Sequence, residues 1–119
     1  MDKLIMVDGK KVPFRATAST TRRYRQKFGR DLLVDMQSLI SGMTGPAPLS
    51  MEMLEAFENV AYIMAKQADP AIPEDPDEWL DGFGMMSIYE ILPEIIELWG
   101  ANTDTLEEPK KKADLQSGV

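Results

Sequence analysis

Two short runs rich in apolar residues lie near the N-terminus, at residues 4–7 and 11–16, and they flank Asp8 and Gly9. An Asp-Gly pair favours the two positive φ angles of a tight type I′ turn, so this segment predicts a β-hairpin. Pro13 cannot donate a ladder hydrogen bond, and we expect its strand to lie at an edge or to pair incompletely there. An isolated hairpin is marginal in water, so its apolar side should pack on the helices that follow.

A first helix is predicted to end at Lys27, with Ser19 or Thr20 as its N-terminal cap. Gly29 is placed to end it in a left-handed turn. Two aromatic residues four positions apart share one face and should enter the core, whereas the other face is strongly basic. The aromatic pair is Tyr24 and Phe28, and the basic residues are Arg22, Arg23, Arg25 and Lys27.

Two longer helices follow, because apolar residues there recur with the 3.6-residue period of an amphipathic helix. Asp31 caps the first of them, which is predicted to run up to Gly42. Residues 42–48 hold two Gly and two Pro and are expected to form a loop. Ser50 opens the longest helix, to about Ala68, which is the expected central core helix. The apolar positions are Leu32, Leu33, Met36, Leu39 and Ile40 in the first, and Met53, Leu54, Phe57, Val60, Ala61 and Met64 in the second.

The last third of the chain predicts two more helices. Asp75 followed by Pro76 starts a short one that presents Trp79, Leu80 and Phe83. Ser87 and Glu90 form a second capping-box pattern, and an apolar face continues from there to Gly100. Pro93 interrupts this pattern, so we expect a kink or a late helix start.

These patterns together predict a mainly α fold. A short N-terminal β-hairpin is followed by about five helices around one core, so that residues 1–100 form a single helical domain. From residue 101 the apolar pattern stops, and residues 101–119 are predicted to be a disordered, flexible tail.

Composition argues against an enzyme. The 119 residues include neither cysteine nor histidine, which removes disulfides, thiolate metal ligands and the usual neutral-pH general base. A dense acidic group invites a metal or catalytic interpretation, but acidic side chains at a helix N-terminus stabilise the helix, and the group lacks the spacing of an EF-hand. Its members are Glu74, Asp75, Asp77, Glu78 and Asp81. We therefore expect no cofactor and no metal.

Charge is divided unevenly along the chain. Residues 1–30 carry a net charge of +7 and residues 31–119 carry −14, within a total of −7. The acidic balance argues against a nucleic-acid binder, because non-specific affinity for phosphates comes from basic surface. Arg22, Arg23, Arg25 and Lys27 are candidates for binding an acidic protein surface, including a second copy of the chain in head-to-tail contact. The alternatives are that these residues bind RNA phosphates or that they form a solvent-exposed face without a partner.

Nine methionines suggest an adaptable binding surface, because flexible thioethers suit varied partners. Met85 and Met86, in a glycine-flanked loop, are the candidates most expected to be exposed. Methionines also fill ordinary cores, and Trp79 and Trp99 are expected to be core anchors rather than binding residues. No apolar stretch approaches the ~20 residues that span a bilayer, so no membrane association is expected.

Four stretches resemble the tail assembly chaperones of long-tailed, siphovirus-like bacteriophages and prophages of Gram-positive bacteria. They are "VDGKKVPFRATASTTRRYRQKFGRDLLVDM", "ENVAYIMAKQADP", "EWLDGF" and "IYEILPEIIELW". The resemblance extends over residues 4–99. Its most distinctive parts are Arg-x-x-Phe-Gly-Arg-Asp from Arg25 to Asp31, the Met-Ala-Lys-Gln-Ala block and the Trp-Leu-x-x-Phe block.

The resemblance implies a non-enzymatic protein that binds the tape-measure protein, keeps it soluble and helps tail-tube subunits polymerise around it. It implies the host bacterial cytoplasm as the location, absence from the mature virion, and a longer form made by programmed frameshift. Pro109 and the three lysines that follow are compatible with a slippery stretch, although a solubilising patch is the simpler interpretation. The rival classes are a structural head–tail joining or tail-completion protein and a small nucleic-acid-binding regulator.

Overall fold

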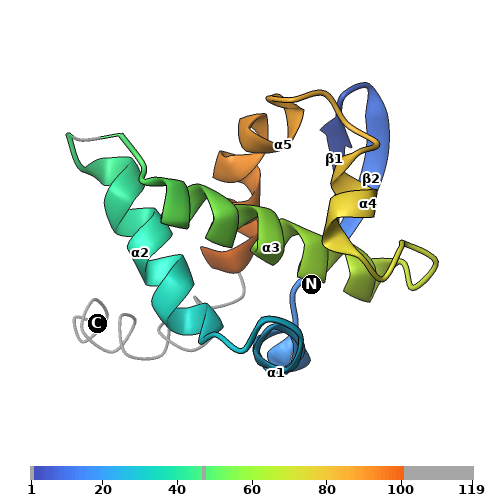
Figure 1. The fold of residues 1–119 in the computed structure, drawn as a ribbon, viewed down its shortest axis with the longest axis horizontal. Coiled ribbons are helices and arrows are strands. Elements are labelled where there is room, and N and C mark those ends of the chain that lie inside the picture. The colour runs from blue at the N-terminus through green and yellow to red at the C-terminus, as the bar shows by residue number, and fades with distance from the viewer. Residues whose placement is uncertain (1, 47, 101–119) are drawn as a thin grey trace, which may run out of the picture.

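The central element of the structure is the helix α3, Met51–Ala68, around which the other elements pack (Figure 1). The structure is a computed structural model and describes residues 2–46 and 48–100. Every residue from Phe57 to Ala65 except the half-buried Glu58 and Asn59 is buried, because α3 has neighbours on several sides. Ser50 caps it by accepting a hydrogen bond from the Met53 amide, as predicted, and Asp69 follows its last turn.

The hairpin is confirmed, with β1 at Asp2–Val7 antiparallel to β2 at Lys10–Arg15. Asp8 and Gly9 have φ values of 56° and 79°, which are the two positive values that a type I′ turn requires. Alternate residues face inward onto α3 and form part of the core: Ile5, Val7, Val12 and Phe14.

The hairpin is also tied to the end of the domain by polar contacts. Lys3 pairs with Glu97 at 2.6 Å, the Gly84 amide donates to Asp8 at 3.2 Å, and Lys10 Nζ donates to the Gly82 carbonyl at 2.9 Å. The N-terminal strands thus depend on residues more than 70 positions later in the chain.

Helix α1, Ala18–Phe28, begins earlier than predicted. Its cap is Thr17 rather than Ser19 or Thr20, because the Thr17 side chain and Thr20 satisfy each other's backbone amides in a capping box. Gly29 ends the helix at a φ of 69°, as predicted.

Helix α2, Leu32–Thr44, is capped by Asp31 as predicted, but it continues two residues past Gly42. The predicted loop at 42–48 is therefore wrong in its first three residues. Gly42 lies close to α3, since a Cβ placed there would meet Met53 Sδ at 2.9 Å and would also clash with Leu49, just before α3. This close approach gives the helical glycine a packing role.

Helix α4, Pro76–Leu80, starts with Asp75 and Pro76 as predicted. Helix α5, Ser87–Glu90, does not use the predicted cap: Ser87 is its first helical residue and Met86 precedes it, without a side-chain capping bond. The helix is interrupted by a turn at Ile91, and a further helix covers residues 92–100. Pro93 lies in the first turn of that helix, where its missing N–H costs nothing, so the predicted late start is confirmed.

The predicted fold class is confirmed: the part of the chain described is mainly helical, with a two-stranded hairpin and six helices. One cluster of buried side chains links the hairpin, α1, α2, α3 and the C-terminal helices, and it includes Trp79 and Trp99. The predicted tail at 101–119 lies outside the described residues.

Candidate partner-binding surfaces

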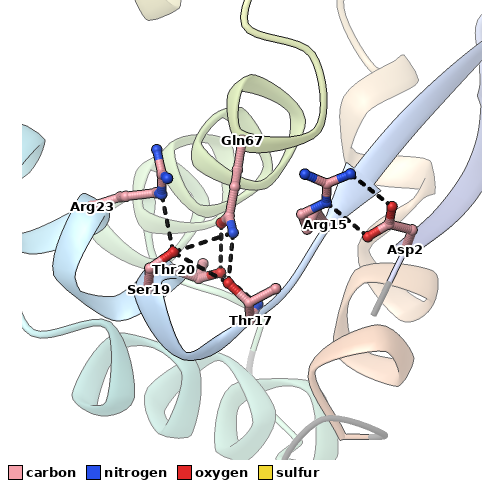
Figure 2. A network of polar contacts seen from close by, with 7 residues as sticks. All are labelled: Asp2, Arg15, Thr17, Ser19, Thr20, Arg23 and Gln67. Carbon is pink, nitrogen blue, oxygen red and sulfur yellow. Dashed lines mark hydrogen bonds and ion pairs between the residues drawn. The ribbon is translucent and has the colours of Figure 1, made fainter.

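The basic helix α1 is held against α3 by a polar network at its N-terminus (Figure 2). Gln67 of α3 donates to Thr17 Oγ1 at 2.6 Å and accepts from Thr20 Oγ1 at 2.7 Å. Nearby, Arg15 at the end of β2 pairs with Asp2 at 2.9 Å, which closes the open end of the hairpin. The network fixes the orientation of α1, and with it the direction of its basic face.

The four predicted basic residues are all exposed, but they differ in their contacts. Arg23 donates from Nε to Ser19 Oγ at 3.1 Å, and Lys27 donates to the Glu74 carbonyl at 2.5 Å. The side chains of Arg22 and Arg25 make no hydrogen bond or ion pair with the described residues. These two arginines are therefore the part of the predicted set that a partner would find unengaged.

Arg23 and Lys27 line a hollow of about 370 Å³ between α1 and α3. The Lys27 ammonium lies 5.8 Å from the centroid of the Tyr62 ring, and Lys66 pairs with Glu74 at 2.9 Å. The Lys66 hydrogen bond lowers the pKa of the Glu74 carboxyl below its usual range. Lys27 and Lys66 in this hollow already contact groups of the same chain, so we expect the hollow to bind an acidic group of a partner only weakly.

Met85 and Met86 are exposed as predicted, by 89% and 60%. They lie in the link between α4 and α5, on the other side of α3 from α1 (Figure 1). Met85 lines a hollow that shares no residue with the one beside α1. The structure therefore places the predicted basic and methionine residues on separate surfaces.

One side of α2, next to its buried residues, carries exposed apolar side chains that the sequence patterns did not predict to be exposed. Leu33 and Ile40 were expected in the core, but they are 57% and 37% exposed. Helix α2 packs on α1 and α3 from one side only, so Leu32, Met36 and Leu39 fill the contact and the neighbouring positions stay outside. We call the side of α2 that carries Leu33, Ile40 and Met43 the α2 face; the exposed Val34 lies on a different side of the helix. The run Leu32-Leu33-Val34 could have indicated exposed apolar residues, because three consecutive residues of a helix cannot all point inward.

A hydrogen bond from Tyr24 to the buried Asp35 joins α1 to α2, and the sequence patterns did not predict it. Asp35 is buried, accepts from the Tyr24 hydroxyl at 2.6 Å, and pairs with Arg30 at 2.8 Å. The hydrogen bond from Arg30 holds the pKa of the Asp35 carboxyl below its usual range, while burial and the Asp35 hydrogen bond raise the pKa of Tyr24. Asp35 is thereby neutralised, although it stands in the middle of a helix with no other charge.

The acidic group around α4 is spread out. In the ranges 2–46 and 48–100, no three His, Cys, Asp or Glu side chains are placed to hold one metal ion. Within those ranges, none of the helices has the length and apolarity to cross a membrane.

Comparison with models of protein families, with curated proteins and with solved structures gave no match.

Proposed function

We propose that this chain is a tail assembly chaperone of a long-tailed bacteriophage or prophage, which binds the tape-measure protein and keeps it soluble. The proposal rests on the resemblance over residues 4–99, and the α2 face is the observation that carries it. Between residues 32 and 51 the only charged residue is Asp35, which is buried and paired. The α2 face is thus an uncharged apolar surface on a chain in which 28% of residues are charged.

Such a surface suits a long helical partner. A tape-measure polypeptide has apolar helical faces that must be covered until the tail tube encloses it. The net charge of −7 keeps the loaded complex in solution by mutual repulsion. The three side chains of the α2 face expose much less area than the ~800 Å² per partner of a stable interface, so each contact is weak and many copies act together. Weak contacts also allow tail-tube subunits to displace the chaperone.

The test is coexpression with the tape-measure protein, with and without a frameshifted extension of this chain. We expect more soluble tape-measure protein, and copurification of the two. Leu33→Lys with Ile40→Lys should abolish both effects. The matched control is Leu4→Lys with Met6→Lys, which places the same charges on apolar residues exposed on the outer side of β1.

Two outcomes would count against the proposal. If neither form of the chain raises the solubility of the tape-measure protein or copurifies with it, the chaperone function is rejected. If the chain is then found in finished virions, the structural head–tail joining or tail-completion alternative replaces it.

The proposal includes contact between copies of the chain. Arg22 and Arg25 of one copy would face the acidic helices of the next, and unlike surfaces that meet in this way produce rings or open spirals. Such contacts weaken with salt. We expect Arg22→Glu with Arg25→Glu to lower the mass measured by light scattering at low salt. A monomeric mass for the unmodified chain at both low and high salt would contradict it.

A further inference from the structure

A groove runs along one side of α3, where α5 and the link before it lie beside the N-terminal half of the helix (Figure 1). One part, of about 410 Å³, includes Met51 and Leu54 in its lining, and the other, of about 350 Å³, includes Phe83 and Met85. Both parts are also lined by Glu58 and Tyr89, whose side chains are hydrogen-bonded to each other. The two hollows therefore adjoin at this pair of side chains, and we call them together the groove.

The lining of both hollows includes apolar side chains, and each hollow has one exposed methionine. Leu54, Leu80 and Phe83 are half-buried, so each offers part of its side chain. Met51, at the start of α3, is 85% exposed and stands at one end, as Met85 does at the other. Thioethers at both ends can adapt to different apolar side chains. From Met51 to Glu58 the groove follows α3 for roughly 10 Å, which is about two turns of a helix.

The charged residues that line the groove are negative, although Lys10 lies at its edge and Arg30 lines a neighbouring hollow with Glu52 and Glu55. The lining of the groove includes the acidic residues Glu52, Glu55, Glu58 and Asp81, and no lysine or arginine. Glu52 and Glu55 are exposed and take part in no ion pair with the described residues. Clefts lined by one sign of charge concentrate the opposite sign.

One cation of the chain itself already uses the edge of this groove. The Lys10 ammonium lies 5.6 Å from the centroid of the Phe83 ring and donates to the Gly82 carbonyl. The hydrogen bond to Glu58 raises the pKa of Tyr89 to about 12, so that the Tyr89 hydroxyl stays a donor. The groove thus combines apolar side chains, an aromatic ring and carboxylates. These three kinds of group suit a ligand that has both an apolar side and positive charges.

We propose that this groove binds a helix of a partner protein whose apolar stripe is flanked by lysine or arginine. The inference rests on the proposed function only for the identity of the partner, which would be a segment of the tape-measure protein with this composition. The basic helix α1 of a second copy does not supply such a stripe, because its apolar side chain Tyr24 is buried. The carboxylates repel nucleic acid and anionic lipid.

The test uses two synthetic peptides of about 18 residues, which is roughly 27 Å of helix. Both carry the same leucine and methionine stripe, flanked by lysine in one and by glutamate in the other. We expect the full chain to bind the lysine peptide in a fluorescence anisotropy titration, and the glutamate peptide at least tenfold more weakly. Glu52→Lys with Glu55→Lys should weaken the lysine peptide about fivefold to tenfold and strengthen the glutamate peptide.

The matched control is Asp77→Lys with Glu78→Lys, which makes the same change in net charge at exposed residues outside the groove lining. We expect it to lower affinity for the lysine peptide less than twofold, with circular dichroism showing that both variants fold. Equal binding of the two peptides would overturn the inference, as would equal losses in the two variants.

Coexpression separates this inference from the proposed function. If the chain solubilises the tape-measure protein and Glu52→Lys with Glu55→Lys does so equally well, the groove is not the site and the function stands. If the lysine peptide binds in the groove but the tape-measure protein is not solubilised, the inference stands and the function fails.

Discussion

Helices α2 and α3 are both rich in apolar residues, but they use them differently. From Ala56 to Ala65 α3 keeps all its apolar side chains inside, whereas α2 buries Leu32, Met36 and Leu39 and leaves the α2 face in solvent. A helix surrounded by neighbours contributes its apolar area to the stability of the fold. A helix covered on one side retains apolar area for a partner. Similar composition thus contributes to stability in α3 and leaves apolar side chains exposed in α2.

The largest effect should come from Phe57→Ala in α3. Phe57 is fully buried, so removal of its ring leaves a cavity and should lower the free energy of unfolding by about 3–5 kcal/mol. Leu33→Ala on the α2 face should change it by less than about 0.5 kcal/mol. Urea unfolding followed by circular dichroism measures both. Similar losses in the two variants would show that the contrast between the helices is wrong.

A second effect concerns Asp35, which attaches α2 to Tyr24 of α1 and pairs with Arg30 of the turn between them. Asp35→Asn should cost about 1–3 kcal/mol at pH 7, because the buried Tyr24 hydroxyl and Arg30 lose their charged acceptor. The pKa of Asp35 lies below its ordinary value of 3.8 in the folded chain, so its contribution is complete above that pH and is lost as the pH falls through the folded value.

The difference in unfolding free energy between the unmodified chain and Asp35→Asn should therefore shrink as the pH is lowered below 3.8. Urea titrations at several pH values measure it, with the exposed Asp77→Asn as control. A difference that stays constant down to pH 2 would rule out a charged Asp35 as the source.

The smallest effect should come from the turn that leads from α1 into α2. Gly29 has a φ of 69°, which costs other residues about 1 kcal/mol. Gly29→Ala should lower the stability by that amount, and Gly29→Asn by less, since asparagine tolerates this conformation. Thermal unfolding distinguishes them. Equal melting temperatures for all three chains would mean that the turn does not constrain α2.

The sequence predicted those parts of the fold that depend on neighbouring residues. The Asp8-Gly9 turn, the Asp31 and Ser50 caps and the interruption at Pro93 all follow from local backbone chemistry, and the structure confirms them. The exposure of Leu33 and Ile40 was missed for a different reason. Periodicity finds an apolar stripe, but it does not say how many neighbours will cover it.

The candidate site was predicted only in part, because its features join distant segments. Arg22, Arg25, Met85 and Met86 are exposed as their positions suggested. Asp35 is neutralised by a residue on the preceding turn, and the groove depends on Glu58 meeting Tyr89, 31 positions later. No local pattern contains such a pair, so these features required the folded chain.

The bonds between the hairpin and residues 82–97 have a consequence for synthesis on the ribosome. The strands are complete at Arg15, but Glu97, the partner of Lys3, follows roughly 80 residues later. At a translation rate of about 5–20 residues per second, the residues that make the last contacts with the hairpin are synthesised about 4–16 seconds after its strands. During that interval α3 is the first long helix able to cover Phe14 and its neighbours, because β2 packs on it. The order of translation therefore favours an early hairpin–α3 unit, which the C-terminal helices close last.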